Sequence, residues 1–341
     1  MAKVTLQSIA DRVGVSRMTV SNAFSRPDQL SAELRERILA AADELGYVGP
    51  DPAARALARG RTGSVGLMLN DRISEAFEDP IAAEFFASVA DRLADSGFAL
   101  TLLTPRTSAD FVPSRDVAMD GALVYICEPD SVDLAWLDRR GLPQVSIDQN
   151  KRGSVTSVNV DDRGGARAAA QHLVDLGHTS IGILTLESIA GPLSQSYPAT
   201  QRMLGWRDAL DPAGIGPRIV TAPYRPAATA YDVAVGLLEA PGRPTAVLCF
   251  SDAFAFGVIR AAEKLGLDVP GDLSVVGFDD SPVAEVTRPP LTTVRQDVAR
   301  KGELAVAALL ATMRGQEQPE DVRLPTELVV RASTAAPRAA T

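Results

Sequence analysis

The stretch TLQSIADRVGVSRMTVSNAF, from Thr5 to Phe24, decides the fold of the N-terminal part of the chain. Its first half carries apolar residues at helical spacing: Leu6, Ile9, Ala10 and Val13. Gly14 then offers a residue that can leave a helix with positive φ, and Ser16 can cap a second helix. The stretch therefore predicts two short helices joined by a tight turn, which is a helix-turn-helix.

The predicted second helix has two different sides. At about 100° per residue, one side collects the apolar residues Val20, Ala23 and Phe24. The other side collects Arg17, Met18, Ser21, Asn22 and Ser25. A helix that enters the DNA major groove needs this division, because one side packs on the protein while the first turns reach base edges.

The outward side chains suit DNA. Arg17 could donate two hydrogen bonds to guanine, Asn22 could pair with adenine, and Met18 could touch a thymine methyl group. Short donors suited to phosphate oxygens accompany them: Ser16, Thr19 and Ser21. The alternative is a helical hairpin that belongs to a larger core, since two-helix patterns with a glycine turn are common.

Composition bounds the class of protein. The 341 residues are 46% hydrophobic and 23% charged, which suits a globular protein of two or three domains. The net charge is −9, and residues 1–61 carry nine Lys and Arg against seven Asp and Glu. The prediction of DNA binding therefore rests on the motif and not on charge. No window approaches the roughly 20 apolar residues of a membrane span, so we expect a cytoplasmic protein without membrane contact.

The few cysteines and histidines suggest no chemistry. Cys127 and Cys249 lie in apolar, strand-like runs and are expected to be core residues. His172 and His178 have no cluster of further ligands around them. We therefore expect no metal site, no cofactor and no catalytic residue.

The segment GPDPAARALARGRTG, which follows a third helix opened by Ser31, predicts a short helix. Asp51 can cap it and Gly60 can end it, which leaves about eight residues, too few to be stable alone in water. We expect this helix to form when it docks on DNA, with Leu57 as an exposed apolar wedge. Arg55 and Arg59 would then lie near phosphates; the alternative is a plain interdomain linker.

From Ser64 onward, short apolar strands alternate with helices. The predicted strands are VGLML, FALTLL, GALVYI, PQVSI, TSVNV, IGILTL, AVLCF, LSVVGF and one near ELVVR. This alternation predicts parallel sheets with helices on both faces. Because the strands are too many for one sheet, the fold class is an all-α helix-turn-helix head plus an α/β body of two doubly wound lobes with a cleft between them.

With these patterns in this order, the chain resembles the LacI/GalR family of bacterial transcriptional regulators over nearly its whole length. The segments that carry the resemblance are the opening stretch, GYVGPDPAARALARGRTGSVG, DLGHTSIGIL, RMLGWRDAL, VPGDLSVVGFDD and PPLTTVRQD. The resemblance implies a DNA-binding domain at 1–49, a hinge helix or linker at 50–62 and a periplasmic-binding-protein-like effector domain at 63–333. Its first lobe would comprise about 63–162 and 293–322, its second about 163–292 and 323–333, followed by a disordered tail at 334–341.

The resemblance also implies a function, that of a homodimeric repressor whose two heads bind a pseudo-palindromic operator in double-stranded DNA. The family's base-reading positions match Arg17, Met18 and Asn22, and Leu57 matches the hinge leucine that opens a central base step. Asp51 departs from the family, which often has asparagine there. The expected DNA-binding residues are Thr5, Leu6, Ser16, Arg17, Met18, Thr19, Ser21, Asn22, Ser31, Arg55, Leu57 and Arg59.

A small-molecule effector is implied for the cleft of the body. The expected effector-binding residues are Phe77, Asp148, Arg202, Tyr224, Ser251, Asp252, Phe254, Asp279 and Gln296. Carboxylates and a guanidinium suit a ring of hydroxyl groups, and aromatic rings suit its apolar face, so the effector would be a sugar, or alternatively a nucleoside or purine. Ser251 departs from the asparagine of many relatives, so the identity of the effector is left open.

Two other classes of protein compete with this interpretation. A Rossmann-type enzyme acting on a sugar or nucleotide is disfavoured, because the sequence has no GxGxxG after a strand, no GxxxxGK[ST] and no nucleophile elbow. A binding or transport sensor without regulatory function is disfavoured by the attached head. The tail after Arg331 has no leucine heptads, so we expect a dimer and no larger assembly.

Overall fold

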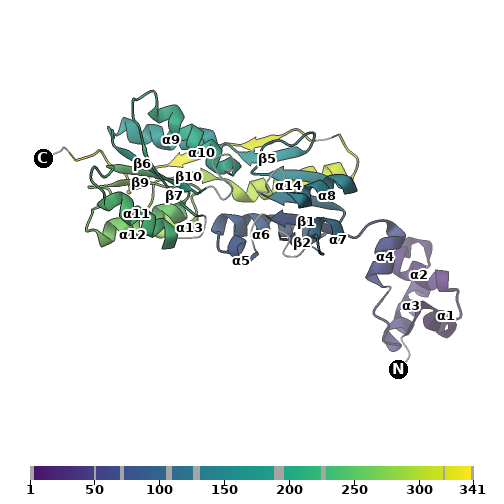
Figure 1. Ribbon diagram of the computed structural model, residues 1–341. Helices are drawn as coiled ribbons and strands as arrows, with labels where there is room; N and C mark the ends of the chain where they lie inside the picture. The colour runs from purple at the N-terminus through teal and green to yellow at the C-terminus, as the bar shows by residue number, and fades with distance from the viewer. Residues whose placement is uncertain are drawn as a thin grey trace. The chain divides into compact units, whose positions relative to one another are not determined.

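The computed structural model describes residues 4–49, 51–69, 73–104, 110–125, 131–187, 196–223, 228–317 and 319–338. The chain divides into two compact units, Met1–Gly63 and Ser64–Thr341, called here the head and the body (Figure 1). Cys127 and Tyr224, expected to be a core and an effector-site residue, lie outside the described residues.

The head is helical, as predicted. Its described elements are α1 (Leu6–Val13), α2 (Arg17–Ser25), the 3-10 turn η1 (Pro27–Gln29), α3 (Ala32–Glu44) and α4 (Pro52–Arg59). Between α1 and α2, Gly14 has a φ of 78°, the left-handed conformation that the turn requires. A small core joins α1, α2 and α3 through Ile9, Ala10, Val20, Ala23, Ile38, Ala41 and Ala42. The helix-turn-helix prediction is confirmed.

The first lobe of the body is built on a six-stranded sheet in the order β11-β5-β4-β3-β1-β2, and every neighbouring pair is parallel. Its strands are β1 (Ser64–Leu69), β2 (Ala99–Leu103), β3 (Gly121–Tyr125), β4 (Gln144–Ile147), β5 (Thr156–Val160) and β11 (Val322–Leu324). Its described helices are α5 (Ile73–Phe77), α6 (Pro80–Asp95), α7 (Pro113–Asp116), α8 (Val132–Arg140) and α14 (Val298–Met313). One apolar cluster joins α6 and α14 to the sheet and another joins α8 to it, so helices cover both faces.

The second lobe is built on a four-stranded parallel sheet in the order β7-β6-β8-β9. Its strands are β6 (Ile181–Leu186), β7 (Arg218–Ala222), β8 (Ala246–Cys249) and β9 (Ser274–Val276). An antiparallel pair, β10 (Thr293–Gln296) with β12 (Thr326–Val329), continues it through single bridges. The helices are α9 (Asp162–Asp175), α10 (Tyr197–Leu210), α11 (Ala228–Glu239), α12 (Asp252–Lys264) and α13 (Pro282–Val286). Helices α11 and α12 pack in one cluster and α9 and α10 in another, so this sheet is also covered on both faces.

The chain passes between the two lobes three times, after β5, after β10 and after β11. The last two crossings follow Gln296 and Leu324, a few residues later than the positions 292 and 322 expected from the sequence. The difference arises because β10 is a short strand that pairs with β12 of the second lobe before α14 begins.

The C-terminal segment is docked up to Arg338, which corrects the expectation of a disordered tail from residue 334. Ser333 is fully buried, and its Oγ donates to the Val275 carbonyl at 2.6 Å. The buried His178 ring lies with Nε2 2.9 Å from the carbonyl oxygen of Ala335. These polar contacts hold a segment that has no apolar run, which is why composition alone suggested disorder.

Candidate functional site

Helix α2 is capped at its start and presents its first turn outward. The Ser16 Oγ accepts a hydrogen bond from the Thr19 N–H at 3.0 Å. Val20 is fully buried, whereas Met18 is 69% exposed and Arg17 beside it is exposed as well. The first turn therefore offers an arginine and a methionine to a partner such as a base edge.

The second turn of α2 is less free. Asn22 is half-buried, and its Nδ2 donates to the Gln29 Oε1 at 3.2 Å. The Ser25 Oγ donates to the Ser21 carbonyl at 2.8 Å. A contact from Asn22 to adenine would have to replace or share the bond to Gln29, the last residue of η1, which was not among the expected DNA-binding residues.

Several expected DNA-binding residues serve as helix caps. Thr5, Ser16 and Ser31 cap α1, α2 and α3, each accepting a bond from a backbone N–H of the first turn. Exposed caps of this kind lie at helix N-termini, which favour anions. The Leu6 side chain, in contrast, is half-buried and packs against the core of the head.

Helix α4 is stabilised by its capping hydrogen bonds and not by side-chain packing. The Asp51 Oδ1 accepts from the N–H groups of Ala53 (2.8 Å) and Ala54 (3.3 Å), and Gly60 ends the helix with a φ of 64°. Leu57 is 87% exposed, and no described side chain of α4 is buried. The expected DNA contacts Arg55 and Arg59 are exposed on the same helix.

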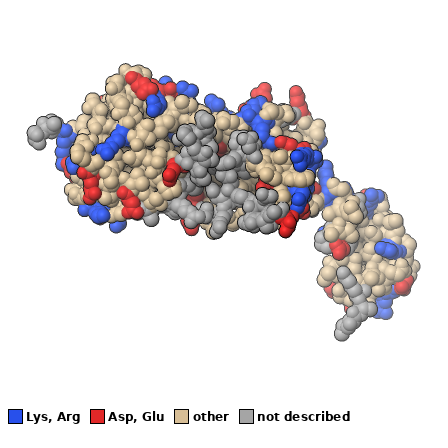
Figure 2. Space-filling model, in the orientation of Figure 1, with Lys and Arg blue, Asp and Glu red and all other residues tan. Residues whose placement is uncertain are grey.

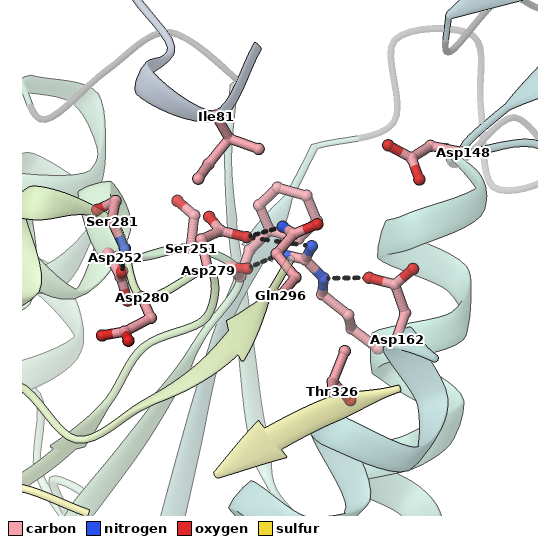
Figure 3. A network of polar contacts seen from close by, with 12 residues as sticks. Ile81, Asp148, Asp162, Ser251, Asp252, Asp279, Asp280, Ser281, Gln296 and Thr326 are labelled. Carbon is pink, nitrogen blue, oxygen red and sulfur yellow. Dashed lines mark hydrogen bonds and ion pairs between the residues drawn. The ribbon is translucent and has the colours of Figure 1, made fainter. Parts of the chain in front are cut away.

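In the body, polar side chains gather where strands of both lobes end. Asp148 follows β4, Asp162 follows β5, Asp279 follows β9 and Gln296 ends β10. Figure 3 shows Asp148 and Asp162 projecting toward the side where Asp279 and Gln296 lie. Parallel α/β sheets bind ligands at the carboxyl ends of their strands, so this is the expected place for a ligand.

Arg202, on α10, is the centre of this gathering. Its Nε donates to the Asp162 Oδ1 at 2.8 Å, and one Nη donates to the Asp279 Oδ1 at 3.3 Å. The other Nη donates to the Phe250 carbonyl at 2.5 Å. The guanidinium carbon lies 3.6 Å from the ring centre of Phe278 and 4.6 Å from that of Phe250, so two rings cover the cation.

The contacts continue into the first lobe. The Gln296 Nε2 donates to the Asp279 Oδ1 at 2.7 Å. The Lys301 ammonium, on α14, donates to the Gln296 Oε1 at 3.3 Å and to the Asp148 Oδ2 at 2.7 Å. One unbroken series of buried contacts, the interlobe network, therefore consists of Asp162, Arg202, Asp279, Gln296, Lys301 and Asp148.

Helix α10, which carries Arg202, is held close to α9 by a glycine. A Cβ on Gly205 would lie 2.2 Å from the Arg163 carbonyl oxygen and 2.9 Å from the Ala166 Cβ. The motif RMLGWRDAL thus places a glycine where the two helix backbones approach, one turn from the arginine that joins the network. Close packing at Gly205 therefore sets the position of Arg202 relative to Asp162, its hydrogen-bond partner at the start of α9.

Burial shifts the pKa values of the carboxyl groups in the interlobe network. Burial raises the pKa of Asp162 to about 6, although Arg202 opposes the shift and Asp148 adds to it. Burial also holds the pKa of Asp279 well above its usual range. Asp148 and Asp279 have φ values of 54° and 115°, which non-glycine residues adopt rarely and mostly at functional positions.

Three expected effector-binding residues have structural roles. Both carboxylate oxygens of Asp252 are occupied, since they accept from the Ser281 N–H (2.7 Å) and the Thr293 hydroxyl (2.5 Å). Ser251 caps α12, accepting from the Phe254 N–H at 3.3 Å. Phe254 is 2% exposed and belongs to the apolar core of the second lobe, which corrects its expected place on a binding-site wall.

The aromatic wall differs from the expectation. Phe77 is 51% exposed and packs edge-on against Phe86 at 5.5 Å. The rings that meet the interlobe network are instead Phe250 and Phe278 on Arg202, and Phe85 at 5.8 Å from the Lys301 ammonium.

The sequence prediction missed two ionisable residues of the network, although both left signals. Asp162 follows a predicted strand almost directly, where ligand-binding carboxylates are common. Lys301 interrupts the buried side of α14, between Val298 and Ala305, where every other buried position is small or apolar. A lone lysine on such a stripe indicates a buried ion pair.

Comparisons with known proteins agree with this architecture. The model of bacterial regulatory proteins of the lacI family matches residues 5–49, and that of a periplasmic binding protein-like domain matches residues 170–334. An HTH-type transcriptional regulator of Mycolicibacterium smegmatis is 37% identical, covering 99% of this chain and 98% of its own.

Solved structures share this architecture over nearly the whole chain. The lac repressor dimer bound to operator and the anti-inducer ONPF has a TM-score of 0.81 and 29% identity, covering 98% of this chain and 99% of its own. The transcriptional regulator CelR–cellobiose complex has a TM-score of 0.71 and 29% identity, covering 97% and 100%. The chain belongs to the LacI family, and it is a transcriptional regulator with a ligand-binding domain.

Two negative findings concern the described part of the chain. None of its helices combines the length and the apolar character needed to cross a bilayer. Nor does that part bring together three His, Cys, Asp or Glu side chains in a way that could hold a metal ion.

Proposed function

We propose that this regulator is a repressor that binds a pseudo-palindromic operator as a homodimer, in the cytoplasm, and that a sugar bound between the lobes of the body controls its DNA affinity. The observation that carries the proposal is the interlobe network. It is buried, it is polar, and it joins residues at strand ends of both lobes. A ligand that binds there contacts both lobes and so can favour one arrangement of the lobes over another.

The head supports the DNA half of the proposal. Arg17 and Met18 face outward from a capped helix, and Leu57 is exposed on a second short helix. Two such heads related by a twofold axis would read two half-sites in opposite directions, which is why the operator is expected to be a pseudo-palindrome. A relative of the same fold is described as a dimer bound to operator.

The chemistry of the body supports a sugar. Carboxylate and amide groups form charge-assisted hydrogen bonds with hydroxyl groups, and Asp148, Asp162, Asp279 and Gln296 supply them. A relative is described as a complex with cellobiose.

The DNA half is tested by selecting bound sequences from a pool of random duplexes with the full-length protein. We expect a pseudo-palindrome with two half-sites, and light scattering should give the mass of a dimer. Enrichment of a single asymmetric half-site by a monomer would contradict the proposal.

The role of the hinge helix is tested with Leu57→Ala. We expect weaker operator binding and an unchanged affinity for any effector, because Leu57 is an exposed residue of the head and the expected effector-binding residues all belong to the body. Val286→Ala, which trims a 69% exposed apolar side chain of the body, is the control and should leave DNA affinity as it is. Loss of effector binding in the Leu57 variant would refute this separation of roles.

The effector is sought by a thermal-shift screen of neutral sugars and nucleosides, and each hit is then tested for its effect on operator binding. A sugar that stabilises the protein and changes its operator affinity supports the proposal. A nucleoside as the only hit, or turnover of a sugar, would replace it with one of the alternatives.

A further inference from the structure

The two histidines of the chain lie against the same stretch of polypeptide, residues 332–338, called here the C-terminal strap. The His172 Nε2 lies 2.9 Å from the Thr334 hydroxyl oxygen, and the His178 Nε2 lies 2.9 Å from the Ala335 carbonyl oxygen. His172 is half-buried on α9, whereas His178, just beyond that helix, is only 2% exposed. Both imidazoles of the sequence therefore belong to one junction.

The strap covers the edge of the sheet in the second lobe, where β9 is the last strand. The Val275 N–H donates to the Ser333 carbonyl at 2.9 Å, and the Ser333 Oγ donates to the Val275 carbonyl at 2.6 Å. The Ala335 N–H donates to the Ser274 Oγ at 3.1 Å. The strap thus occupies backbone groups that β9 would otherwise present at an open sheet edge.

The strap is attached by polar contacts. Its described residues are alanine, serine, threonine, proline and arginine, so it buries no large apolar side chain. Each hydrogen bond contributes little net stability, because the released groups would bond to water instead. A moderate penalty at the histidine junction is therefore enough to shift the strap from attached to released.

The His178 ring fits this junction in its neutral form. Because a carbonyl oxygen only accepts, the Nε2 carries the hydrogen that points to Ala335. The Nδ1 is then the acceptor for the Thr245 hydroxyl at 2.8 Å. A proton on Nδ1 would require that hydroxyl to turn to the Ser180 carbonyl, 3.1 Å away. The hydrogen bonds could thus be kept, and the cost of protonation is that of a buried charge.

The groups around the two rings compensate a positive charge poorly. Thr245, Ser274 and the strap present hydroxyl and carbonyl groups to them, whereas the described surface of the body carries interspersed charges of both signs (Figure 2). Burial lowers the pKa of His172, although the exposed Asp175 on the same helix opposes the shift. Burial also lowers the pKa of His178; the bond to the strap carbonyl opposes this shift, and a charged His172 adds to it.

The far end of the strap carries charges of a different range. Arg338 donates to the Asp272 Oδ1 at 2.5 Å and to the Asp268 Oδ2 at 3.1 Å. The Asp268 N–H lowers the pKa of Asp272 most, and the cations Arg338 and Arg243 add to the shift. The ion pair of Arg338 with Asp272 therefore persists down to about pH 4, below the range in which histidines titrate.

From this junction, we infer that the C-terminal strap is released by acid: when His172 and His178 take up protons, between about pH 7 and pH 5, residues 332–338 leave the edge of β9. The attached strap binds protons less tightly than the released strap, because burial lowers the pKa of both rings. Attachment is therefore strongest above the ordinary histidine pKa of about 6.5 and weakens as the pH falls through the lowered values.

Release also affects the strand end beside the strap. The Thr292 N–H donates to the Ser333 Oγ at 2.8 Å, and the Thr292 carbonyl accepts from the Gly277 N–H at 2.9 Å. Gly277 lies between β9 and Asp279 of the interlobe network. Proton uptake by two distant histidines would thus free a sheet edge and loosen the segment that positions Asp279.

The test is amide hydrogen exchange of the full-length protein at pH 8, 7, 6 and 5, with each rate corrected for the intrinsic pH dependence of exchange. Protection of the peptides that contain Val275 and Ala335 should fall at least about threefold from pH 8 to pH 5. Strand β6, inside the same sheet, should keep or gain protection. Unchanged protection of the strap peptides overturns the inference, as does a parallel loss in β6, which would indicate general unfolding.

Variants identify the groups responsible. Glutamine can donate to the same oxygens and does not titrate, so the double variant His172→Gln, His178→Gln should lose the dependence on pH. Arg338→Gln, the control, should lower protection of the strap equally at every pH and keep the fall. A fall of wild-type size in the double variant overturns the role of the histidines. If that variant fails to fold, His172→Gln alone should reduce the fall, and an unreduced fall counts against the inference.

Discussion

The buried Asp162 makes the stability of the body depend on pH in a predictable direction. Burial raises its pKa from 3.8 to about 6 in the folded chain, because the charged form loses water and the Arg202 contact restores only part of that loss. The folded state therefore binds the proton more tightly than the unfolded state. Stability from this group is fully present below about pH 4 and is lost as the pH rises through about 6.

The size of the effect follows from the shift. A difference of about two pKa units corresponds to about 3 kcal/mol of unfolding free energy. No discount for solvent screening applies, since the side chain is fully buried. Asp252, whose pKa burial raises to about 7, acts in the same direction, whereas His172 and His178, whose pKa values burial lowers, act in the opposite direction.

The variant Asp162→Asn isolates the contribution of Asp162 from that of the other titrating groups. We expect the unfolding free energy of the variant minus that of the wild type to increase by about 3 kcal/mol from about pH 4 to pH 8. The reason is that the amide does not titrate, whereas the wild type loses the stability contributed by protonated Asp162. Denaturant unfolding of the full chain, followed by fluorescence of the buried Trp206 on α10, measures this difference at each pH. Asp175→Asn is the control and should run parallel to the wild type. A difference between variant and wild type that does not change with pH would refute the reasoning.

Further predictions concern packing and recognition. Gly205→Ala should destabilise the body by about 1–3 kcal/mol in urea unfolding, because its Cβ would meet the Arg163 carbonyl, whereas Gly236→Ala, with open space at its Cβ, should stabilise it by about 0.5–1 kcal/mol. Ser333→Ala should cost about 1–3 kcal/mol in the same assay, because it leaves the Val275 carbonyl without its hydroxyl donor. Arg17→Ala should relax the preference at one operator position by about 1–3 kcal/mol in a binding titration over base variants; a uniform loss over all variants would instead indicate a phosphate contact.

The regular elements of the body were predictable wherever strands are buried on both faces. TSVNV and IGILTL are strands over the same residues, Thr156–Val160 and Ile181–Leu186, because every residue, or all but the last, is buried. The strands Arg218–Ala222, Thr293–Gln296 and Val322–Leu324 were missed, the second because only four residues with an exposed Arg295 among them form it. The other two strands share a different cause. Both lie at sheet edges with exposed or half-buried side chains, so neither contains the apolar run on which the prediction depended.

The candidate ligand site was predicted in part. The resemblance placed Asp148, Arg202, Asp279 and Gln296 together, and the structure joins them through hydrogen bonds and one lysine. Which oxygen of a carboxylate is free depends on side-chain rotamers, and these depend on packing between distant segments. The pair of Asp148 and Lys301 spans 153 positions of the chain, so no local pattern could reveal it.

The aromatic residues that the resemblance implied for the site are placed differently in the structure. The resemblance placed Phe254, which follows the capped start of α12, near a wall of the ligand site. In the structure it points into the second lobe with Ala255 and Val258, because the helical period places these three toward the sheet. The rings that do cover the Arg202 cation, Phe250 and Phe278, end the predicted strands AVLCF and LSVVGF and were not predicted to belong to the site.

The interlobe network contributes little to the stability of the body, which indicates a role other than stability. Burying two cations and three carboxyl groups costs several kcal/mol for each ion, and well-packed apolar residues at such positions are often as stabilising or more so. The network leaves oxygens of Asp148 and Asp162 unpartnered as well. A ligand that donates to these oxygens would recover part of that cost only when the two lobes are arranged around it. On the function proposed above, relief of these unpartnered oxygens would add to the free energy with which a small molecule favours one arrangement of the lobes, and apolar residues between the lobes would contribute nothing of this kind.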